Sequence, residues 1–102
     1  MSWASHIIEK LKLGETVNFR PHGNSMTPKI ESGQLCTVEP TDIKNIKKGD
    51  IVIAKVNGNV YLHLVSAIKG DNEQFQISNN HGHANGWTAA KNIFGKLIKV
   101  ET

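Results

Sequence analysis

An Asn-Gly step between two β-rich segments is the feature that most constrains how this chain folds. Residues 51–56 and 60–68 are rich in valine, isoleucine and leucine, and Asn57-Gly58-Asn59 separates them. Asparagine and glycine accept the positive φ angles of a tight hairpin turn, while β-branched side chains favour strands. The pattern therefore predicts a β-hairpin in the middle of the chain.

Alternating or short apolar runs predict four further strands. They cover residues 17–19, 35–39, 75–78 and 93–100, and Gly95 interrupts the last one. Residues 79–86 are polar and rich in glycine, so we expect a loop there. About six short strands and one helix predict a mostly β protein, built as a small coiled β-sheet or partial barrel. No linker or repeat divides the chain, so we expect residues 1–102 to form a single domain.

Residues 2–13 have the spacing of a short amphipathic helix. Ser2 is a candidate cap at its start, and Gly14 is a candidate end. The apolar residues form one stripe, which we expect to pack on the core, with a partner-binding helix as the alternative. The stripe consists of Trp3, Ala4, Ile7, Ile8 and Leu11.

Charge and composition argue against several classes of function. The net charge is only +3, and the six aromatic residues are not interleaved with basic clusters, which argues against a nucleic-acid partner. The longest aliphatic run, residues 51–54, is far shorter than the roughly 20 residues of a membrane span. The single cysteine, Cys36, precludes an internal disulfide and is expected to be a buried structural thiol. We therefore expect a soluble, cytoplasmic protein without a membrane span.

Two residues are candidates for nucleophilic catalysis. Ser25 lies in Gly23-Asn24-Ser25-Met26-Thr27-Pro28, where glycine permits close backbone approach and proline fixes the chain after the serine. His63 lies in the second strand of the predicted hairpin, and imidazole can accept a hydroxyl proton at neutral pH. Each signal has an ordinary alternative: a common polar turn for the serine, and a packed strand residue for the histidine.

Four motifs, in order between residues 17 and 100, resemble the signal-peptidase and LexA protease superfamily. Residues 23–34 resemble its Ser-Met-x-Pro motif with a following Gly-Asp, except that Gln34 replaces the aspartate. Residues 48–52 resemble the second Gly-Asp box, residues 61–65 the strand that carries the base, and residues 92–98 the closing strand. Bacterial signal peptidases and LexA-type proteases carry lysine as the base. This chain is similar to the endoplasmic-reticulum and archaeal enzymes, which carry histidine.

The resemblance implies a small serine endopeptidase with the fold of that superfamily and no cofactor. It implies Ser25 as nucleophile and His63 as general base, and a peptide or protein substrate bound in extended form, with small residues beside the cut. Asn79 stands where the family's base-orienting aspartate is expected, so it is the candidate for that role. The candidates for the oxyanion site and substrate cleft are Gly23, Asn24, Met26 and Pro28.

Some features depart from the family pattern and leave an alternative open. The orienting aspartate is missing, and Gly23 offers no oxyanion-stabilising hydroxyl two residues before the serine. A non-catalytic protein-binding module that retains the peptidase fold is therefore the alternative function. His81 and His83 are expected to be solvated loop residues because no second cluster stands at metal-ligand spacing, and His22 is expected to line the cleft.

Overall fold

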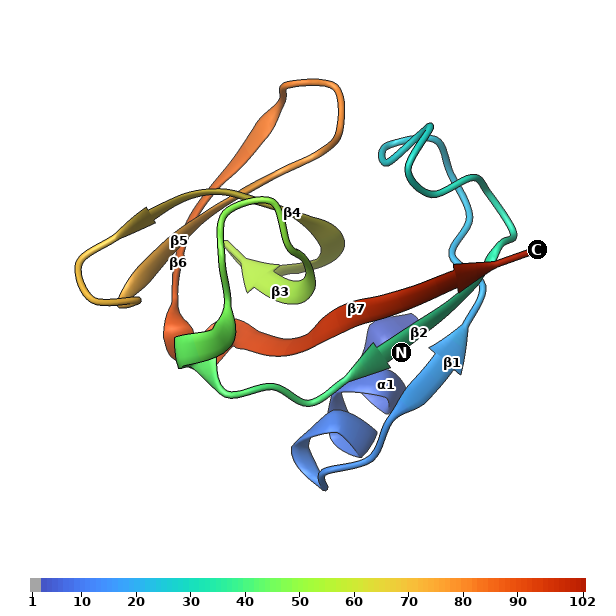
Figure 1. Cartoon of the computed structure of the whole chain (residues 1–102), viewed down its shortest axis with the longest axis horizontal. Helices are drawn as coiled ribbons and strands as arrows, with labels where there is room; N and C mark the ends of the chain where they lie inside the picture. The colour runs from blue at the N-terminus through green and yellow to red at the C-terminus, as the bar shows by residue number, and fades with distance from the viewer. Residues whose placement is uncertain (1–2) are drawn as a thin grey trace.

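The computed structural model describes residues 3–102, which form one short helix followed by an antiparallel sheet (Figure 1). The expected helix cap, Ser2, lies outside the described residues. The fold class predicted from the sequence, mostly β with a short N-terminal helix, is confirmed. The elements are α1 (Trp3–Lys12), β1 (Val17–Phe19), β2 (Leu35–Glu39), the 3-10 helix η1 (Ile43–Asn45), β3 (Ile51–Val56), β4 (Asn59–Lys69), β5 (Gln74–Ser78), β6 (Ala84–Ala89), the 3-10 helix η2 (Ala90–Asn92) and β7 (Ile93–Glu101).

The seven strands form one sheet in the order β1-β2-β7-β3-β4-β5-β6, with every neighbouring pair antiparallel. The predicted hairpin is its centre, since β3 and β4 pair from Val56 and Asn59 onward. Asn57 and Gly58 both have positive φ, as a two-residue turn with the twist of the flanking strands requires.

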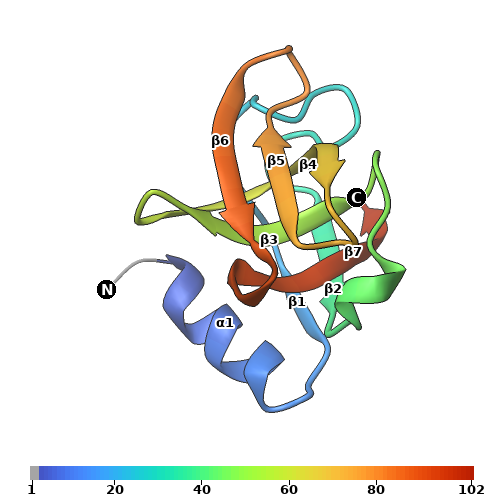
Figure 2. The same ribbon diagram turned by 90° about the vertical axis from the view of Figure 1, so that its left-hand side faces the viewer.

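The sheet coils so strongly that its last strand returns to its middle. Thr88 of β6 donates a hydrogen bond to the carbonyl of Lys55 in β3, although β4 and β5 lie between these strands in the sheet order. Figure 2 shows β5 and β6 crossing β3 and β7. Alternation along β3 then sends Ile53 into one core cluster and Val52, Ala54 and Val56 into a second.

Helix α1 covers the first of these clusters. Ala4, Ile7 and Leu11 are buried and Ile8 packs against the cluster, so these four members of the apolar stripe pack on the core as expected. The side chain of Trp3, the fifth member, lies outside the described part of the structure. The strand beneath has a glycine because a side chain would not fit: a Cβ on Gly95 would lie 2.8 Å from the Glu39 carbonyl oxygen and 3.0 Å from Leu11 Cδ2. The predicted burial of the Cys36 thiol is also confirmed, since that side chain is fully buried in the same cluster.

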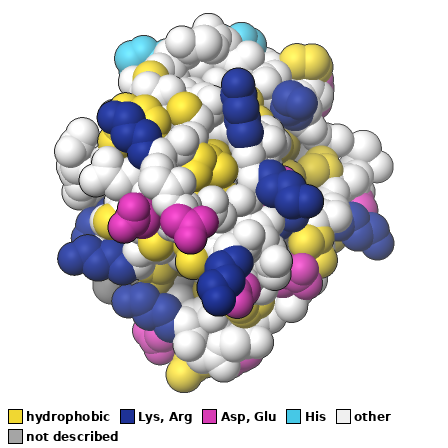
Figure 3. Space-filling model, turned by 60° about the vertical axis from the view of Figure 1, so that its left-hand side comes forward, with side chains coloured by type: hydrophobic (Ala, Val, Ile, Leu, Met, Phe, Trp, Pro, Cys, Tyr) yellow, Lys and Arg dark blue, Asp and Glu magenta, His cyan; other side chains and the backbone are white. Residues whose placement is uncertain are grey.

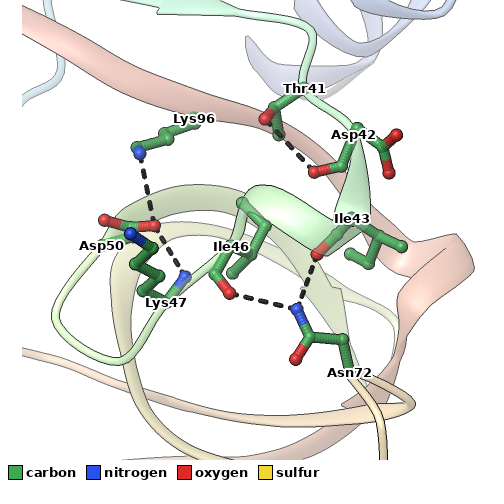
Figure 4. Close-up of polar contacts among 8 residues, drawn as sticks. All are labelled: Thr41, Asp42, Ile43, Ile46, Lys47, Asp50, Asn72 and Lys96. Carbon is green, nitrogen blue, oxygen red and sulfur yellow. Dashed lines mark hydrogen bonds and ion pairs between the residues drawn. The ribbon is translucent and has the colours of Figure 1, made fainter.

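Polar contacts hold the connection between β2 and β3 (Figure 4). The amide of Asn72 donates to the carbonyls of Ile43 and Ile46, and the Asp50 carboxylate accepts the backbone N–H of Lys47. Asp50 also pairs with Lys96 of β7 at 3.4 Å. These contacts fix the point at which β3 begins.

The expected loop over residues 79–86 is wrong in its last three residues, which begin strand β6 (Ala84–Ala89). Ala84, Asn85 and Gly86 have little intrinsic strand preference, but pairing with β5 overrides it.

On the molecular face shown in Figure 3, lysine and arginine side chains are dispersed and acidic groups lie between them. Of the helices in residues 3–102, none is long and apolar enough to cross a membrane.

Candidate active site

Ser25 lies on an irregular turn between β1 and β2 that is closed by hydrogen bonds between its own residues. The N–H of Gly33 donates to the Pro21 carbonyl at 2.8 Å, and the N–H of Gly23 donates to the Ser32 hydroxyl at 3.1 Å. Met26 and Ile30 are buried in the first core cluster, which anchors the turn, whereas Ser25 is exposed. The turn therefore presents its serine to solvent while its apolar side chains hold it in place.

His63 lies on β4 and is buried, with its side chain 7% exposed. It pairs in register with Val52 of β3. Two residues further on, Val65 exchanges backbone hydrogen bonds with Gly49 and Asp50, each at 2.8 Å. The Gly-Asp box of the sequence thus fixes the strand that carries the histidine.

The structure brings Ser25 and His63 into hydrogen-bond contact. The distance from Ser25 Oγ to His63 Nε2 is 3.1 Å. The Tyr61 ring stacks on the imidazole, with centroids 4.8 Å apart and planes 23° from parallel, and this contact restricts the imidazole's rotation. The distance is within the range at which a histidine can accept a serine proton.

The residue that contacts the other imidazole nitrogen is Asn85, and the expectation for Asn79 is wrong. His63 Nδ1 lies 2.7 Å from Asn85 Oδ1. Asn79 instead accepts the backbone N–H groups of His81 and His83, so its amide is occupied within its own loop. Because an amide oxygen can only accept, Nδ1 carries the proton, and Nε2 presents its lone pair to the Ser25 hydroxyl.

A β-bulge explains why Asn85 reaches the histidine. In β6, Gly86 pairs with Ile77 and Ala84 pairs with Ser78, so Asn85 between them has no register partner. A bulge adds one residue to a strand and redirects its side chain, and such bulges are common beside active sites. The signal in the sequence was the Asn-Gly step at residues 85–86, where Gly86 has φ +137°.

The surroundings of His63 favour its neutral form. Burial lowers its pKa below the usual value, and the nearby His83 lowers it further, while the hydrogen bond with Asn85 opposes both. Desolvation is the largest of these effects because a charged imidazole loses hydration when it is buried. At neutral pH, His63 is therefore in the form that can accept a proton.

The connection between β5 and β6 also holds the serine turn, and Figures 1 and 2 show these two segments side by side. The backbone N–H of Asn80 donates to the Ser25 carbonyl at 2.8 Å, and its side-chain amide donates to the Thr27 carbonyl at 2.8 Å. His81 Nε2 lies 2.9 Å from the Asn24 carbonyl oxygen and 3.1 Å from Thr27 Oγ1. His81, expected to be a solvated loop residue, is thus exposed but bonded to the serine turn.

A cleft of about 470 Å³ opens at Ser25 and His63, and both residues line it. Gly23 and Met26, two of the four cleft candidates, also line it, as does His22. The other two candidates, Asn24 and Pro28, belong to the same turn but are not part of the cleft wall. The Asn24 carbonyl stabilises the turn, because it accepts hydrogen bonds from the backbone N–H and the hydroxyl of Thr27.

Among known protein families, the model of the Peptidase S24-like family matches residues 3–98 of the chain. The match covers nearly all of the 102 residues, including the serine turn and the strands that carry His63 and Asn85. It confirms the resemblance to the LexA and signal-peptidase type of domain. No curated protein matches the sequence.

Proposed function

We propose that this chain, which belongs to the Peptidase S24-like family, is a serine endopeptidase that uses Ser25 as nucleophile and His63 as general base. The observation that carries the proposal is the 3.1 Å contact between Ser25 Oγ and His63 Nε2 at the cleft. Three features support it: the serine is exposed to a substrate, the base is buried, and a third residue orients the base. An adjacent base that is itself oriented by a third group is the usual arrangement for activating a hydroxyl nucleophile.

In the proposed reaction, His63 Nε2 takes the hydroxyl proton as Ser25 Oγ attacks the carbonyl carbon of the peptide bond. Backbone N–H groups near Ser25 stabilise the resulting oxyanion. The C–N bond then breaks, and the protonated Nε2 gives its proton to the leaving amine. A water molecule, deprotonated by the same nitrogen, then attacks the carbonyl carbon of the acyl-serine ester. The ester C–O bond breaks, the carboxylic acid product leaves, and Nε2 returns the proton to Ser25 Oγ. Asn85 Oδ1 accepts a hydrogen bond from Nδ1–H throughout, which keeps that proton on Nδ1 and Nε2 facing the serine.

The substrate is an extended peptide laid against the edge of β4. Residues 59–64 pair with β3 on one side, whereas pairing with β5 begins only at Leu64. Over residues 60–63, the other edge of β4 has no strand partner within the described part of the chain, and these residues line the cleft. An extended peptide can add a strand at such an edge through main-chain hydrogen bonds.

The alternative, a non-catalytic binding module, is not favoured. The missing family aspartate was its main support, and Asn85 occupies the position from which such a group acts on the histidine. A neutral amide stabilises the imidazolium less than a carboxylate does, so we expect a slow peptidase.

Turnover of a peptide library, followed by mass spectrometry, tests the proposal. Ser25→Ala should abolish cleavage, and His63→Ala should reduce it nearly as far, because the two groups act as one unit. His6→Ala is the matched control, since His6 is an exposed histidine outside the cleft wall. A serine-reactive probe should add its mass to wild type and not to Ser25→Ala. Equal product from wild type and Ser25→Ala would refute the proposal.

A further inference from the structure

Two asparagines of the chain, Asn57 and Asn85, are followed directly by glycine. In such a dipeptide, the backbone nitrogen of the glycine can attack the side-chain Cγ of the asparagine, because glycine has no Cβ to obstruct the approach. The attack closes a succinimide ring and releases ammonia. Asn57 belongs to an exposed hairpin turn, whereas Asn85 is half-buried against His63, so the two sites differ in their surroundings.

The contact with His63 activates the Asn85 amide toward this attack. Attack at Cγ places negative charge on Asn85 Oδ1, and His63 Nδ1 donates a hydrogen bond to that oxygen at 2.7 Å. A fixed donor aimed at an oxygen on which charge develops stabilises the transition state. The hydrogen bond that orients the base therefore also promotes a reaction of its own acceptor.

The bulge in β6 permits the backbone movement that this reaction requires. Asn85 has no register partner on β5, and β6 is the last strand of the sheet, as Figure 2 shows. The ladder is disrupted at a bulge, so fewer contacts oppose rotation of the backbone there. Gly86 is required by the fold, because its φ is +137° and a Cβ would lie 3.2 Å from Val56 Cγ1. The structure thus needs a glycine at the position that makes Asn85 reactive.

We infer that Asn85 is a site of spontaneous deamidation, which replaces the amide beside His63 with a carboxylate. The Gly86 nitrogen forms a bond with Asn85 Cγ, the Cγ–Nδ2 bond breaks, and the proton of the Gly86 N–H leaves with Nδ2 as ammonia. Water then opens the ring. Addition of water at Cγ gives aspartate, and addition at the backbone carbonyl carbon gives isoaspartate. In both cases the Gly86 nitrogen regains a proton from the water.

The two products have opposite consequences for the proposed function, on which this part of the inference rests. Aspartate keeps the shape of the side chain and places a carboxylate at the 2.7 Å contact, which is the kind of group that the family pattern has and this sequence lacks. Isoaspartate lengthens the backbone of β6 and shortens the side chain, so it withdraws the carboxylate from the ring. Chains with aspartate should therefore cleave peptide about tenfold faster than unmodified chains, and chains with isoaspartate should be slower.

Mass spectrometry of the folded Ser25→Ala protein, incubated at mildly alkaline pH and digested with trypsin, measures the modification without turnover. Trypsin separates the two sites, because Asn57 falls in the peptide of residues 56–69 and Asn85 in that of residues 70–91. Fragment ions should locate a gain of about 1 Da at position 85. Asn85→Gln should abolish this gain, since glutamine would have to close a larger ring. Asn57 is the internal reference for the rate.

His63→Leu tests the role of the imidazole, because leucine suits a buried position but offers no donor to Asn85 Oδ1. The rate at position 85, divided by the rate at position 57, should fall roughly two- to tenfold. His6→Leu is the matched control, since His6 is exposed on α1, and it should leave this ratio unchanged. If His63→Leu does not fold, His63→Gln tests the same point, because its amide can reach the position of Nε2 but not that of Nδ1.

Two results would overturn the inference. One is the absence of conversion at position 85 in the folded protein over a period in which the same chain, unfolded in urea, converts there. The other is a folded His63 variant whose rate ratio is unchanged or higher.

Peptide turnover by aged wild type, with its aspartate and isoaspartate chains separated by chromatography, tests the consequence for the proposed function. The aspartate fraction should match Asn85→Asp in rate, and an aspartate fraction no faster than unmodified chains would refute this consequence. If position 85 converts but no fraction cleaves peptide, the proposed function fails and the modification site stands.

Discussion

Replacing Asn85 with aspartate changes the group that faces His63 Nδ1 from a neutral amide to a carboxylate of nearly the same shape. The 2.7 Å contact is short and half-buried, so the change acts directly on the imidazole. The carboxylate favours the protonated ring, and it should therefore raise the pKa of His63 and stabilise the imidazolium that forms during attack. Asn85→Ala removes the hydrogen bond and should lower that pKa, since the bond with Asn85 raises it in the native protein.

The size of the effect follows from the kind of hydrogen bond. A neutral hydrogen bond contributes about 0.5–1.5 kcal/mol, and one to a charged group about 1.5–3 kcal/mol. The difference of roughly 1–1.5 kcal/mol corresponds to about a tenfold change in rate. We therefore expect Asn85→Asp to raise kcat about tenfold at pH 8 and Asn85→Ala to lower it by up to about tenfold.

Peptide turnover across pH, together with an NMR titration of the His63 ring, measures both effects. For Asn85→Asp, the acid limb of kcat/KM should move to higher pH, so its advantage should shrink in mild acid. Asn59→Asp is the control, because it adds the same charge at an exposed position outside the cleft wall. If Asn85→Asp leaves both the titration and the pH profile of the wild type unchanged, the idea that Asn85 orients the base is wrong.

The remaining predictions concern pH, packing and the serine turn. In wild type, kcat/KM should fall only as pH drops through a His63 pKa below the usual value of about 6.5, because burial lowers it and the base must be neutral. Gly95→Ala should reduce the free energy of unfolding by about 1–3 kcal/mol in urea titration, since the new Cβ would lie 2.8 Å from the Glu39 carbonyl oxygen; an unchanged midpoint would contradict this. His81→Ala should lower kcat by roughly two- to tenfold through loss of its contact with the Asn24 carbonyl. His6→Ala should not, and a rise in KM with kcat unchanged would argue against a positioning role for His81.

Much of the fold could be predicted because local chemistry and tertiary structure agree in most segments. The Asn57-Gly58 turn needs positive φ at both positions, and only a few residue types supply it. The stripe of α1 and the strands β2 and β3 were likewise visible in the spacing of apolar residues. β6 was missed because its first residues have no strand signal of their own, and its place depends on β5 and on the Thr88 contact with β3.

For the site, the sequence could name Ser25 and His63 but not the residue that orients the base. Motif order along the chain indicated Asn79, because the family's acid stands near that position. In the structure, the bulge in β6 places Asn85 against the histidine instead. This bulge depends on the pairing register between residues 77–78 and 84–86, which cannot be read from a linear motif. The hydrogen bonds from Asn80 and His81 to the serine turn could not be predicted from the sequence for the same reason. Each joins residues that are more than 50 positions apart in the chain.

The connection from β5 to β6 acts on both members of the proposed catalytic pair. Asn80 and His81 hold the turn that carries Ser25, and Asn85, a few residues later, holds the ring of His63. A local opening of this one segment would release nucleophile and base together, so their disorder would be correlated rather than independent. The fraction of molecules competent for attack would then follow a single opening equilibrium. The effects on kcat of two substitutions in this segment would therefore not be additive, because both act on the same opening equilibrium.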